Sequence, residues 1–272
     1  MKTSNLIDGK AAAQAIREKL VGHDAALAVI VVGENAASKV YVRNKKRACE
    51  EVGIRFYEKK LPEMASTDDV IQAIHDIQDW ANGIIVQLPL PPQVDKKRVI
   101  EAIPSEKDVD CFTPYNLGRL MRGDGVVLPC TPAGIMNLLG NVSGGKHCVV
   151  VGRSDIVGKP LAMMLLQADA TVTVCHSKTK NLSSFTKQAD VLISAVGKPF
   201  FITADMVKPG ATVIDVGMNR NPITGKLCGD VDFEAVSQIA GSITPVPGGV
   251  GPMTVAMLLK NTVTAAEGRE HE

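Results

Sequence analysis

The sequence lacks any hydrophobic segment long enough to place it in a membrane. No apolar run approaches the roughly 18 residues that a membrane-spanning helix needs. The first ten residues, MKTSNLIDGK, contain no apolar core of the kind found in secretory signal peptides. Lys and Arg number 30 and Asp and Glu 29, so the net charge of +1 does not indicate binding to nucleic acid or to a membrane surface. We therefore expect a cytoplasmic protein that acts on a small molecule.

Paired cysteines and metal-binding motifs are missing as well. The six cysteines form no C-x-x-C pair, and the five histidines show no H-E-x-x-H or similar ligand spacing. A chain of 272 residues, of which 45% are hydrophobic, can bury sizeable cores without cross-links. We expect reduced cysteines, no disulfide framework and no bound metal.

Short apolar runs alternate with helix-length segments along the whole chain. The runs are ALAVIVVG, GIIVQLPLP, HCVVVG, ATVTVC, ADVLISAVG and ATVIDVG. Continuous apolar runs of this length are typical of strands that are buried on both faces of a parallel sheet. The segments between them include AASKVYVRNKKRACEEVG and GKPLAMMLLQAD, which have the length of helices. This alternation predicts an α/β protein with doubly wound sheets.

A Gly- and Pro-rich stretch, RGDGVVLPCTPAG, marks the predicted domain boundary. We expect two doubly wound α/β domains flanking a cleft. The first would contain residues 1–129 together with a C-terminal helix, 253–272, and the second residues 130–252. Open α/β sheets bind ligands at the carboxyl ends of their strands. The segments that follow the strands are therefore the candidate functional ones.

The stretch VVVGRSDIVGKP resembles a nucleotide-binding turn without its full glycine pattern. Gly152 ends a strand and Gly158 opens a helix, whose free N–H groups could bind a phosphate. Arg153 and Ser154 stand where a G-x-G-x-x-G motif would continue. The next strand ends in CHSK, without the acidic residue that holds the ribose 2′-hydroxyl of NAD. The side chains of Arg153, Ser154 and Ser177 could together hold the 2′-phosphate of NADP. The alternative is a surface arginine beside an ordinary strand–helix turn.

The segment from Ala37 to Val52 predicts an amphipathic helix with a lysine on its packed side. At about 100° per residue, one narrow sector contains Ala37, Tyr41, Lys45, Ala48 and Val52. In one interpretation Lys45 lies at the edge of this stripe and reaches water. In the other, the stripe faces a cleft, Tyr41 offers a ring for stacking, and Lys45 is a partly desolvated amine that moves protons.

Three further polar residues stand out between the domains' apolar runs. Gln87 interrupts GIIVQLPLP, where it could hold a backbone turn or orient a catalytic amine. Asp108 and Asp110 lie in the loop SEKDVDCFTP, where an acid caps a helix or faces water more often than it binds a ligand. In TPVPGGVGPMT, Thr244 to Thr254, the glycines would let the backbone approach a flat ligand closely. We expect a helix to begin after Pro252.

Six motifs in this order closely resemble those of the FolD family, bifunctional methylenetetrahydrofolate dehydrogenases and methenyltetrahydrofolate cyclohydrolases. The motifs are YVRNK, VQLPLP, EKDVD, VVVGRSDIVGKP, TVCHSKT and TPVPGGVGPMTVAML. The resemblance covers almost the whole chain, from about Asp8 to the last helix. It implies oxidation of 5,10-methylenetetrahydrofolate by NADP⁺, hydrolysis of the methenyl product to 10-formyltetrahydrofolate, and a homodimer formed through Rossmann-type NADP-binding domains.

The resemblance also implies roles for individual residues. Lys45 would be the central catalytic group, Gln87 would hold its amine, Tyr41 would stack on the folate and Asp110 would bind the pterin. The residues implied in folate binding are Tyr41, Val86, Gln87, Leu88, Asp110, Pro247, Gly248, Gly249, Val250 and Gly251. Those implied in NADP binding are Gly152, Arg153, Ser154, Ser177 and Met218.

Two positions depart from the family pattern. Cys111 follows Asp110 where the family has glycine, so a positive φ there would strain the backbone. A cysteine beside the pterin could also make the enzyme sensitive to thiol reagents. Met218 replaces an isoleucine, which is a mild change. The sequence is also compatible with a shikimate-type dehydrogenase, a non-enzymatic NADP-binding regulator or a dehydrogenase without the hydrolase step.

Overall fold

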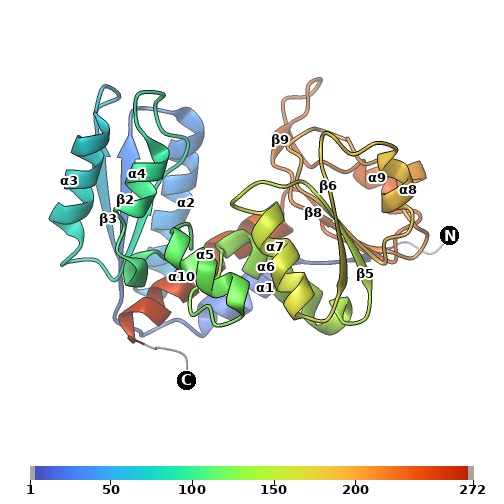
Figure 1. Cartoon of the computed structure of the whole chain (residues 1–272), viewed down its shortest axis with the longest axis horizontal. Coiled ribbons are helices and arrows are strands. Elements are labelled where there is room, and N and C mark those ends of the chain that lie inside the picture. Colours follow the sequence, from blue (N-terminus) through green and yellow to red (C-terminus); the bar gives the residue numbers. More distant parts are fainter. Residues whose placement is uncertain (1–3, 269–272) are drawn as a thin grey trace. The chain divides into compact units, whose positions relative to one another are not determined.

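The computed structural model describes residues 4–268, without the side chains of residues 36 and 37. The chain forms two compact units, each with its own parallel sheet (Figure 1). The three-stranded unit contains Gln14–Cys130 and the chain from Val255 onward, and the six-stranded unit contains Thr131–Thr254 and the chain up to Ala13. The boundaries between the units fall inside the helices α1 (Gly9–Glu18), α6 (Cys130–Leu139) and α10 (Val250–Ala266).

The three-stranded unit has strand order β3-β2-β4, with all strands parallel. The strands are β2 (Ala26–Val32), β3 (Arg55–Leu61) and β4 (Gly83–Val86). The helices are α2 (Ala36–Val52), α3 (Thr67–Ile77), α4 (Lys96–Glu101) and α5 (Pro114–Arg122), with a 3₁₀ turn at Ser105–Lys107. Every residue of β2 is buried, because α3 covers one face of the sheet and α2 lies on the other (Figure 1).

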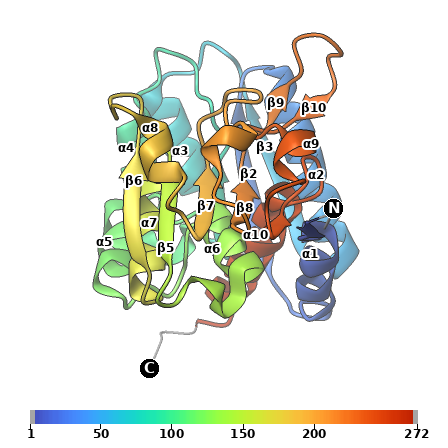
Figure 2. The same cartoon turned by 90° about the vertical axis from the view of Figure 1, so that its right-hand side faces the viewer.

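The six-stranded unit has strand order β1-β11-β8-β7-β5-β6, also parallel throughout. Figure 2 shows β6, β5, β7 and β8 side by side. The strands are β1 (Asn5–Leu6), β5 (His147–Val151), β6 (Thr171–Cys175), β7 (Val191–Ser194), β8 (Thr212–Asp215) and β11 (Ser242–Ile243). The other elements are α7 (Gly158–Gln167), α8 (Leu182–Thr186), α9 (Phe233–Val236), the 3₁₀ turns Gly140–Ser143 and Ala204–Met206, and the hairpin β9 (Asn219–Arg220) and β10 (Leu227–Cys228).

Alternate residues of β5 enter two different cores, so both faces of the larger sheet are covered. Cys148 and Val150 pack with residues of α6 and α7, whereas Val149 and Val151 pack on the other face with residues around α9. This arrangement confirms the predicted α/β class with parallel sheets. All six cysteines are buried and unpaired.

Each of the six predicted apolar runs contains a strand, but β6 differs from the expectation of burial on both faces. Only Cys175 is buried in β6, because this strand lies at the edge of the sheet. The strand β3, with sequence RFYEKKL, was not predicted, since charged residues interrupt its apolar pattern. Helix α10 begins at Val250 rather than after Pro252.

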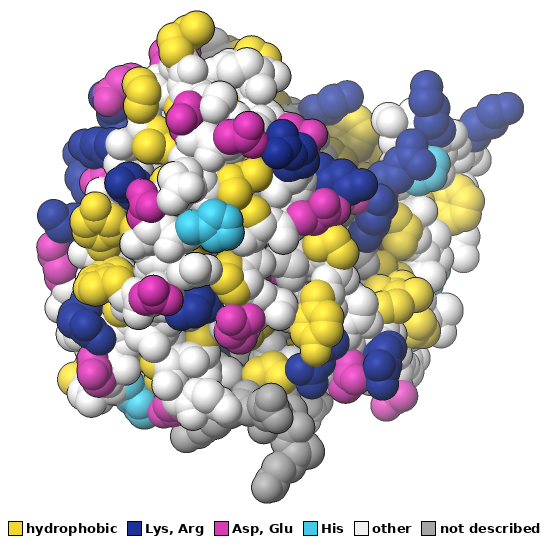
Figure 3. All heavy atoms as spheres, turned by 60° about the vertical axis from the view of Figure 1, so that its left-hand side comes forward, with side chains coloured by type: hydrophobic (Ala, Val, Ile, Leu, Met, Phe, Trp, Pro, Cys, Tyr) yellow, Lys and Arg dark blue, Asp and Glu magenta, His cyan; other side chains and the backbone are white. Residues whose placement is uncertain are grey.

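The surface matches the nearly balanced charge of the sequence. On the face shown in Figure 3, basic and acidic side chains are intermixed and apolar side chains are scattered between them. Among the residues that the structure describes, no helix combines the length and the apolar character that crossing a bilayer requires.

Candidate active site

Lys45 and Gln87 meet at the carboxyl end of the smaller sheet. Lys45 Nζ donates a hydrogen bond of 3.1 Å to Gln87 Oε1. The amide nitrogen of Gln87 donates to the carbonyl oxygen of Leu88 at 2.8 Å, and this contact turns the amide oxygen toward the amine. Gln87 follows the last residue of β4, and its backbone N–H donates to the carbonyl oxygen of Ile30 in β2 at 2.9 Å. The sheet therefore fixes the position of the amide that holds Lys45.

Helix α2 packs through only part of the expected stripe, because Ala48 and Val52 are buried but Tyr41 is not. The side chains of Ser38, Val42, Ala48, Cys49 and Val52 are buried. Tyr41 is 40% exposed, so it does not belong to the packed face of the helix. Lys45 is partly buried. The residues at positions 42 and 49 share the core side because they are seven apart, close to two helical turns. Tyr41 is thus free to contact a ligand beside Lys45.

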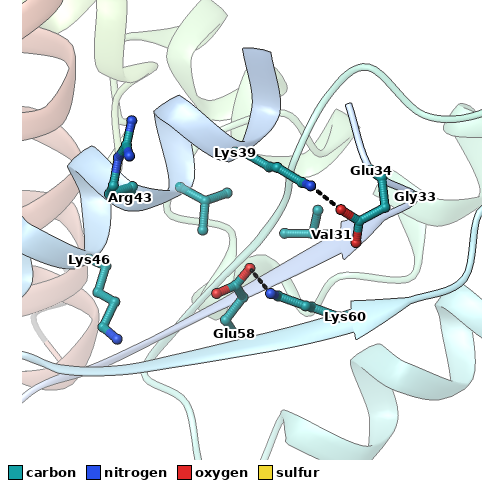
Figure 4. A pocket seen from close by; sticks show the side chains of 9 residues that line it. Val31, Gly33, Glu34, Lys39, Arg43, Lys46, Glu58 and Lys60 are labelled. Atoms are coloured by element: carbon teal, nitrogen blue, oxygen red, sulfur yellow. Dashed lines mark ion pairs between the residues drawn. The ribbon is translucent and has the colours of Figure 1, made fainter. Parts of the chain in front are cut away.

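The opposite flank of α2 carries a separate pocket of about 410 Å³ (Figure 4). Four of its charged side chains form ion pairs: Lys39 with Glu34, and Lys60 with Glu58, whose Nζ and Oε1 atoms are 3.7 Å apart. None of the residues assigned to folate or NADP from the sequence lines this pocket. Tyr41 and Lys45 therefore lie outside this pocket.

Asp108 and Asp110 have different roles in their shared loop. Asp108 is 1% exposed, and its carboxylate accepts hydrogen bonds from the backbone N–H groups of Phe112, at 3.0 Å, and Thr113, at 2.8 Å. It also accepts from the Thr113 hydroxyl at 2.7 Å and from the side-chain amide of Asn116 at 3.0 Å. Asp108 thus folds the loop into the start of α5, which leaves Asp110 as the acid available to a ligand.

Asp110 is partly buried beside Lys45 and Cys130. The Cys130 thiol lies 3.5 Å from an Asp110 carboxylate oxygen and 3.3 Å from the carbonyl oxygen of Val109. Asn261 of α10 donates to that same carbonyl at 2.8 Å, which fixes the backbone next to Asp110. Burial raises the pKa of Asp110 above its ordinary value, and the charge of Lys45 opposes this rise.

The backbone of Cys111 adopts the strained conformation that was expected if this position has a positive φ. Its φ is 58°, in the left-handed region that favours glycine. Its side chain is 0% exposed, and burial together with the charges of Asp108 and Asp110 raises the pKa of its thiol. A buried thiol that resists ionisation is a poor nucleophile. The burial and raised pKa of the thiol argue against sensitivity to thiol reagents at Cys111.

The segment Thr244–Thr254 brings its glycines against other backbone. A Cβ on Gly9 would overlap the carbonyl oxygen of Gly249, so the start of α1 packs directly on this turn. Gly248 has a φ of 115°, and the side chain of Lys10 lies beside it. Pro247 is exposed, Gly251 is partly buried, and Gly248, Gly249 and Val250 are buried. Lys10 was not predicted, because nothing in its local sequence links it to this turn.

The turn after β5 is a close-packed backbone cradle. Gly152 has a φ of 132°, and a Cβ there would overlap the carbonyl oxygen of Ala195. A Cβ on Gly158 would in turn overlap the carbonyl oxygen of Gly152. Only glycine fits at either position, because a side chain would collide with the neighbouring backbone, and the turn therefore follows a tight path into the start of α7. These residues fit a bound dinucleotide.

Strand register places Arg153 and Ser177 at the same edge of the larger sheet. Val151 of β5 pairs with Cys175 of β6, and each of the two candidate residues stands two positions beyond this pair. Both side chains are exposed. Ser154 differs, because its hydroxyl accepts hydrogen bonds from the N–H groups of Val157 at 3.2 Å and Gly158 at 3.4 Å. Its hydroxyl therefore stabilises the first turn of α7.

Met218 lies at the carboxyl end of β8, next to the glycine-rich turn. A Cβ on Gly251 would stand 3.6 Å from the Met218 sulfur, and Met218 is 45% exposed. The structure thus brings together a residue assigned to the cofactor and one assigned to the folate.

Comparisons with known proteins cover nearly the whole chain. Residues 7–110 match the catalytic domain of the tetrahydrofolate dehydrogenase/cyclohydrolase family, and residues 129–270 match its NAD(P)-binding domain. The chain is 53% identical to the bifunctional protein FolD of Burkholderia orbicola, over 97% of each protein. The crystal structure of FolD from Campylobacter jejuni has a TM-score of 0.94 at 48% identity and covers 98% of this chain and 99% of its own.

A second solved structure adds a bound cofactor. FolD of Trypanosoma brucei, complexed with NADP and an inhibitor, has a TM-score of 0.93 at 38% identity, and the match covers 98% of this chain and 99% of that one. Both domains of the family match this chain, and a relative that is 53% identical covers 97% of it. The chain belongs to the tetrahydrofolate dehydrogenase/cyclohydrolase family.

Proposed function

We propose that Lys45 and Gln87 form the catalytic centre of a bifunctional folate enzyme. The protein oxidises 5,10-methylenetetrahydrofolate to the methenyl form with NADP⁺ and hydrolyses the product to 10-formyltetrahydrofolate. The observation that carries the proposal is the 3.1 Å hydrogen bond from the Lys45 amine to the Gln87 amide, with Asp110 nearby. Family membership argues against the alternatives of a shikimate-type dehydrogenase and a non-enzymatic regulator.

Hydrolysis of the methenyl product needs a group that moves protons. Water adds to the one-carbon atom, and the Lys45 amine accepts a proton from it. The resulting hydroxyl loses its proton to solvent and becomes the formyl oxygen as the bond between N5 and that carbon breaks. Lys45 returns its proton to N5, which leaves the formyl group on N10. Gln87 keeps the amine directed at the reacting carbon, which is the contribution of a positioned acid–base group.

Asp110 and Tyr41 would bind the folate on either side of Lys45. The Asp110 carboxylate would accept hydrogen bonds from the pterin's amino group and ring nitrogen. The exposed ring of Tyr41 would stack on the substrate. Further contacts within the three-stranded unit would come from Val86 and Leu88. In the six-stranded unit, the closely packed glycines of Pro247–Gly251 would present backbone to a flat ligand.

NADP⁺ supplies the carbon that accepts the hydride. The glycine cradle at Gly152 would hold the pyrophosphate at the start of α7. Arg153 and Ser177, which the strand register places at one sheet edge, would hold the 2′-phosphate. Ser154 would act mainly by keeping the first turn of α7 in place, and Met218 would contribute backbone contacts.

We also propose that the enzyme is a cytoplasmic homodimer formed through the six-stranded units, as the family resemblance implies. Light scattering should then give a mass of twice the 28.9 kDa chain. A mass of one chain at micromolar concentration would overturn this part of the proposal.

Substitution of Lys45 tests the catalytic assignment. Lys45→Met should lower the cyclohydrolase rate by about 100-fold or more, the usual contribution of a general acid–base group, while folate still binds. Lys46→Met is the matched control, because Lys46 lies one residue away on the charged flank of α2. Hydrolysis at the wild-type rate in Lys45→Met would show that the assignment is wrong.

A further inference from the structure

Asp230 is a buried carboxylate that binds the loop after β7. It is 0% exposed and lies just after β10. Its Oδ2 accepts hydrogen bonds from the backbone N–H groups of Val196, at 2.7 Å, and Gly197, at 3.2 Å, and its Oδ1 accepts from that of Lys198 at 3.0 Å. One side chain thus fixes three consecutive amides at the carboxyl end of the sheet.

The same carboxylate also binds two side chains. The hydroxyl of Ser194, the last residue of β7, donates to Oδ2 at 3.2 Å. The side-chain amide of Asn219, in β9, donates to Oδ1 at 2.8 Å. Asp230 therefore joins the segment that follows β7 to the segment that follows β8.

Asp215 holds Asp230 in place from the neighbouring strand. Asp215 is 3% exposed. Its carboxylate accepts hydrogen bonds, each of 2.9 Å, from the backbone N–H groups of Asp230, Val231 and Gly217. Its own N–H donates to the Thr244 hydroxyl at 2.8 Å. The pair thus links the ends of β7 and β8 to the segment that leads into the glycine-rich turn.

Each carboxylate packs on a glycine. A Cβ on Gly217 would overlap the carboxylate and the backbone nitrogen of Asp230, and a Cβ on Gly229 would overlap the carboxylate of Asp215. Such close approach leaves no room for water between the carboxylates and the backbone. The two loops are therefore held by direct hydrogen bonds whose acceptors cannot be replaced by solvent.

These loops border the residues assigned to the cofactor. The carbonyl oxygen of Ala195, one residue before the amides bound by Asp230, lies against Gly152. Met218, between Gly217 and Asn219, lies beside Gly251. Asp230 itself is enclosed and cannot touch a ligand, but it sets the backbone of both neighbouring segments.

We infer that Asp230, supported by Asp215, is a positioning residue for the dehydrogenase step alone. It fixes the strand-end backbone against which NADP⁺ is held for hydride transfer, and it takes no part in the hydrolysis assigned to Lys45. The inference rests on the proposed NADP⁺ site. It goes beyond that site by assigning cofactor alignment to two carboxylates that contact neither substrate.

Asp230→Asn tests the inference, because an amide cannot accept from donors on both of its termini. Asp205→Asn is the control: Asp205 is an exposed acid of the same unit, so the change in charge is identical. Three quantities are compared with wild type: the Kd for NADP⁺ by calorimetry, hydrogen exchange of the amides 196–198, and hydrolysis of supplied methenyltetrahydrofolate. In Asp230→Asn we expect a Kd at least tenfold higher, faster exchange at these amides, and hydrolysis within twofold of wild type.

An unchanged Kd for NADP⁺ in folded Asp230→Asn would overturn the inference, as would loss of hydrolysis in parallel with dehydrogenation. Should this variant not fold, Asn219→Ala decides, since it removes one donor and leaves both carboxylates. That variant should raise the Kd about threefold without affecting hydrolysis, and an unchanged Kd would overturn the inference. Absence of NADP⁺ binding by the wild-type protein would instead reject the proposed function itself.

Discussion

The amine of Lys45 donates a hydrogen bond of 3.1 Å to the side-chain amide oxygen of Gln87. The nitrogen of the same amide donates a hydrogen bond to the carbonyl oxygen of Leu88. The amide therefore cannot turn over without losing both hydrogen bonds. This arrangement joins a helix residue to a strand-end residue 42 positions further along the chain and fixes the direction in which the amine points.

Removal of the amide should separate the two activities. Gln87→Leu leaves Lys45 without the contact that orients it, so we expect the cyclohydrolase rate to fall by about 10- to 100-fold, with a smaller effect on dehydrogenation. Gln93→Leu serves as the control, because Gln93 is an exposed glutamine of the same unit. Equal losses in both activities would contradict an orienting role for Gln87.

Arg153 should determine the choice between NADP⁺ and NAD⁺. A charge-assisted hydrogen bond contributes about 1.5–3 kcal/mol, so Arg153→Ala should raise the KM for NADP⁺ by about 10- to 100-fold. The KM values for folate and for NAD⁺ should change little. Arg220→Ala, an exposed arginine of the same unit, is the control. If the KM for NAD⁺ rises as much as that for NADP⁺, Arg153 does not bind the 2′-phosphate.

The Cys111→Gly variant should be more stable than the Cys111→Ala variant. At its φ of 58°, any residue with a Cβ carries a cost that glycine avoids, of about 1–2 kcal/mol. Both substitutions remove the buried thiol, so the comparison isolates the backbone. We expect the free energy of unfolding, measured with urea, to be about 1 kcal/mol higher for Cys111→Gly than for Cys111→Ala. The reverse order would show that the left-handed conformation is not adopted in solution.

Asp215 should make stability depend on pH. Burial raises the pKa of Asp215 to about 6 from its ordinary value of 3.8, with the charge of Asp230 adding to the rise and the backbone N–H groups opposing it. Between these values the folded protein binds more protons than the unfolded chain, so the free energy of unfolding falls as pH rises through this window.

Asp215→Asn lacks this titration and provides the comparison. Its free energy of unfolding relative to wild type should increase by roughly 2.4 kcal/mol between pH 4 and pH 7, given about 1.4 kcal/mol per pKa unit. Denaturant unfolding at several pH values measures the difference. A difference that stays constant over this range would contradict a raised pKa for Asp215.

The parts of the fold that could be predicted from sequence are those in which local pattern and burial agree. The run AVIVV of β2 is apolar because both of its faces are covered, and the strand is where the pattern indicates. RFYEKKL of β3 could not be recognised, since an edge strand tolerates charged residues on its open side. The exposed position of Tyr41 depends on how α2 rotates against the sheet, which only packing decides.

The candidate site divides in the same way. Lys45 and Gln87 were recognisable as polar residues in apolar surroundings, and the structure joins them. Asp215 and Asp230 were not recognised, because a single acid at a strand end has no local pattern that distinguishes a buried network from a solvated loop. The hydroxyl of Ser154 faces the start of α7, a direction that residue identity alone does not determine.

The discontinuous make-up of the units has a consequence for synthesis on the ribosome. The carbonyl groups of Val109 and Leu128 are held by Asn261, which belongs to the last helix. Asp110 thus reaches its final surroundings only after almost the entire chain has been translated. Strand β1, near the other end of the chain, pairs with β11 and therefore cannot pair until β11 has been translated. A nascent chain would carry an Asp110 loop without its Asn261 contacts and an unpaired first strand until translation is nearly complete.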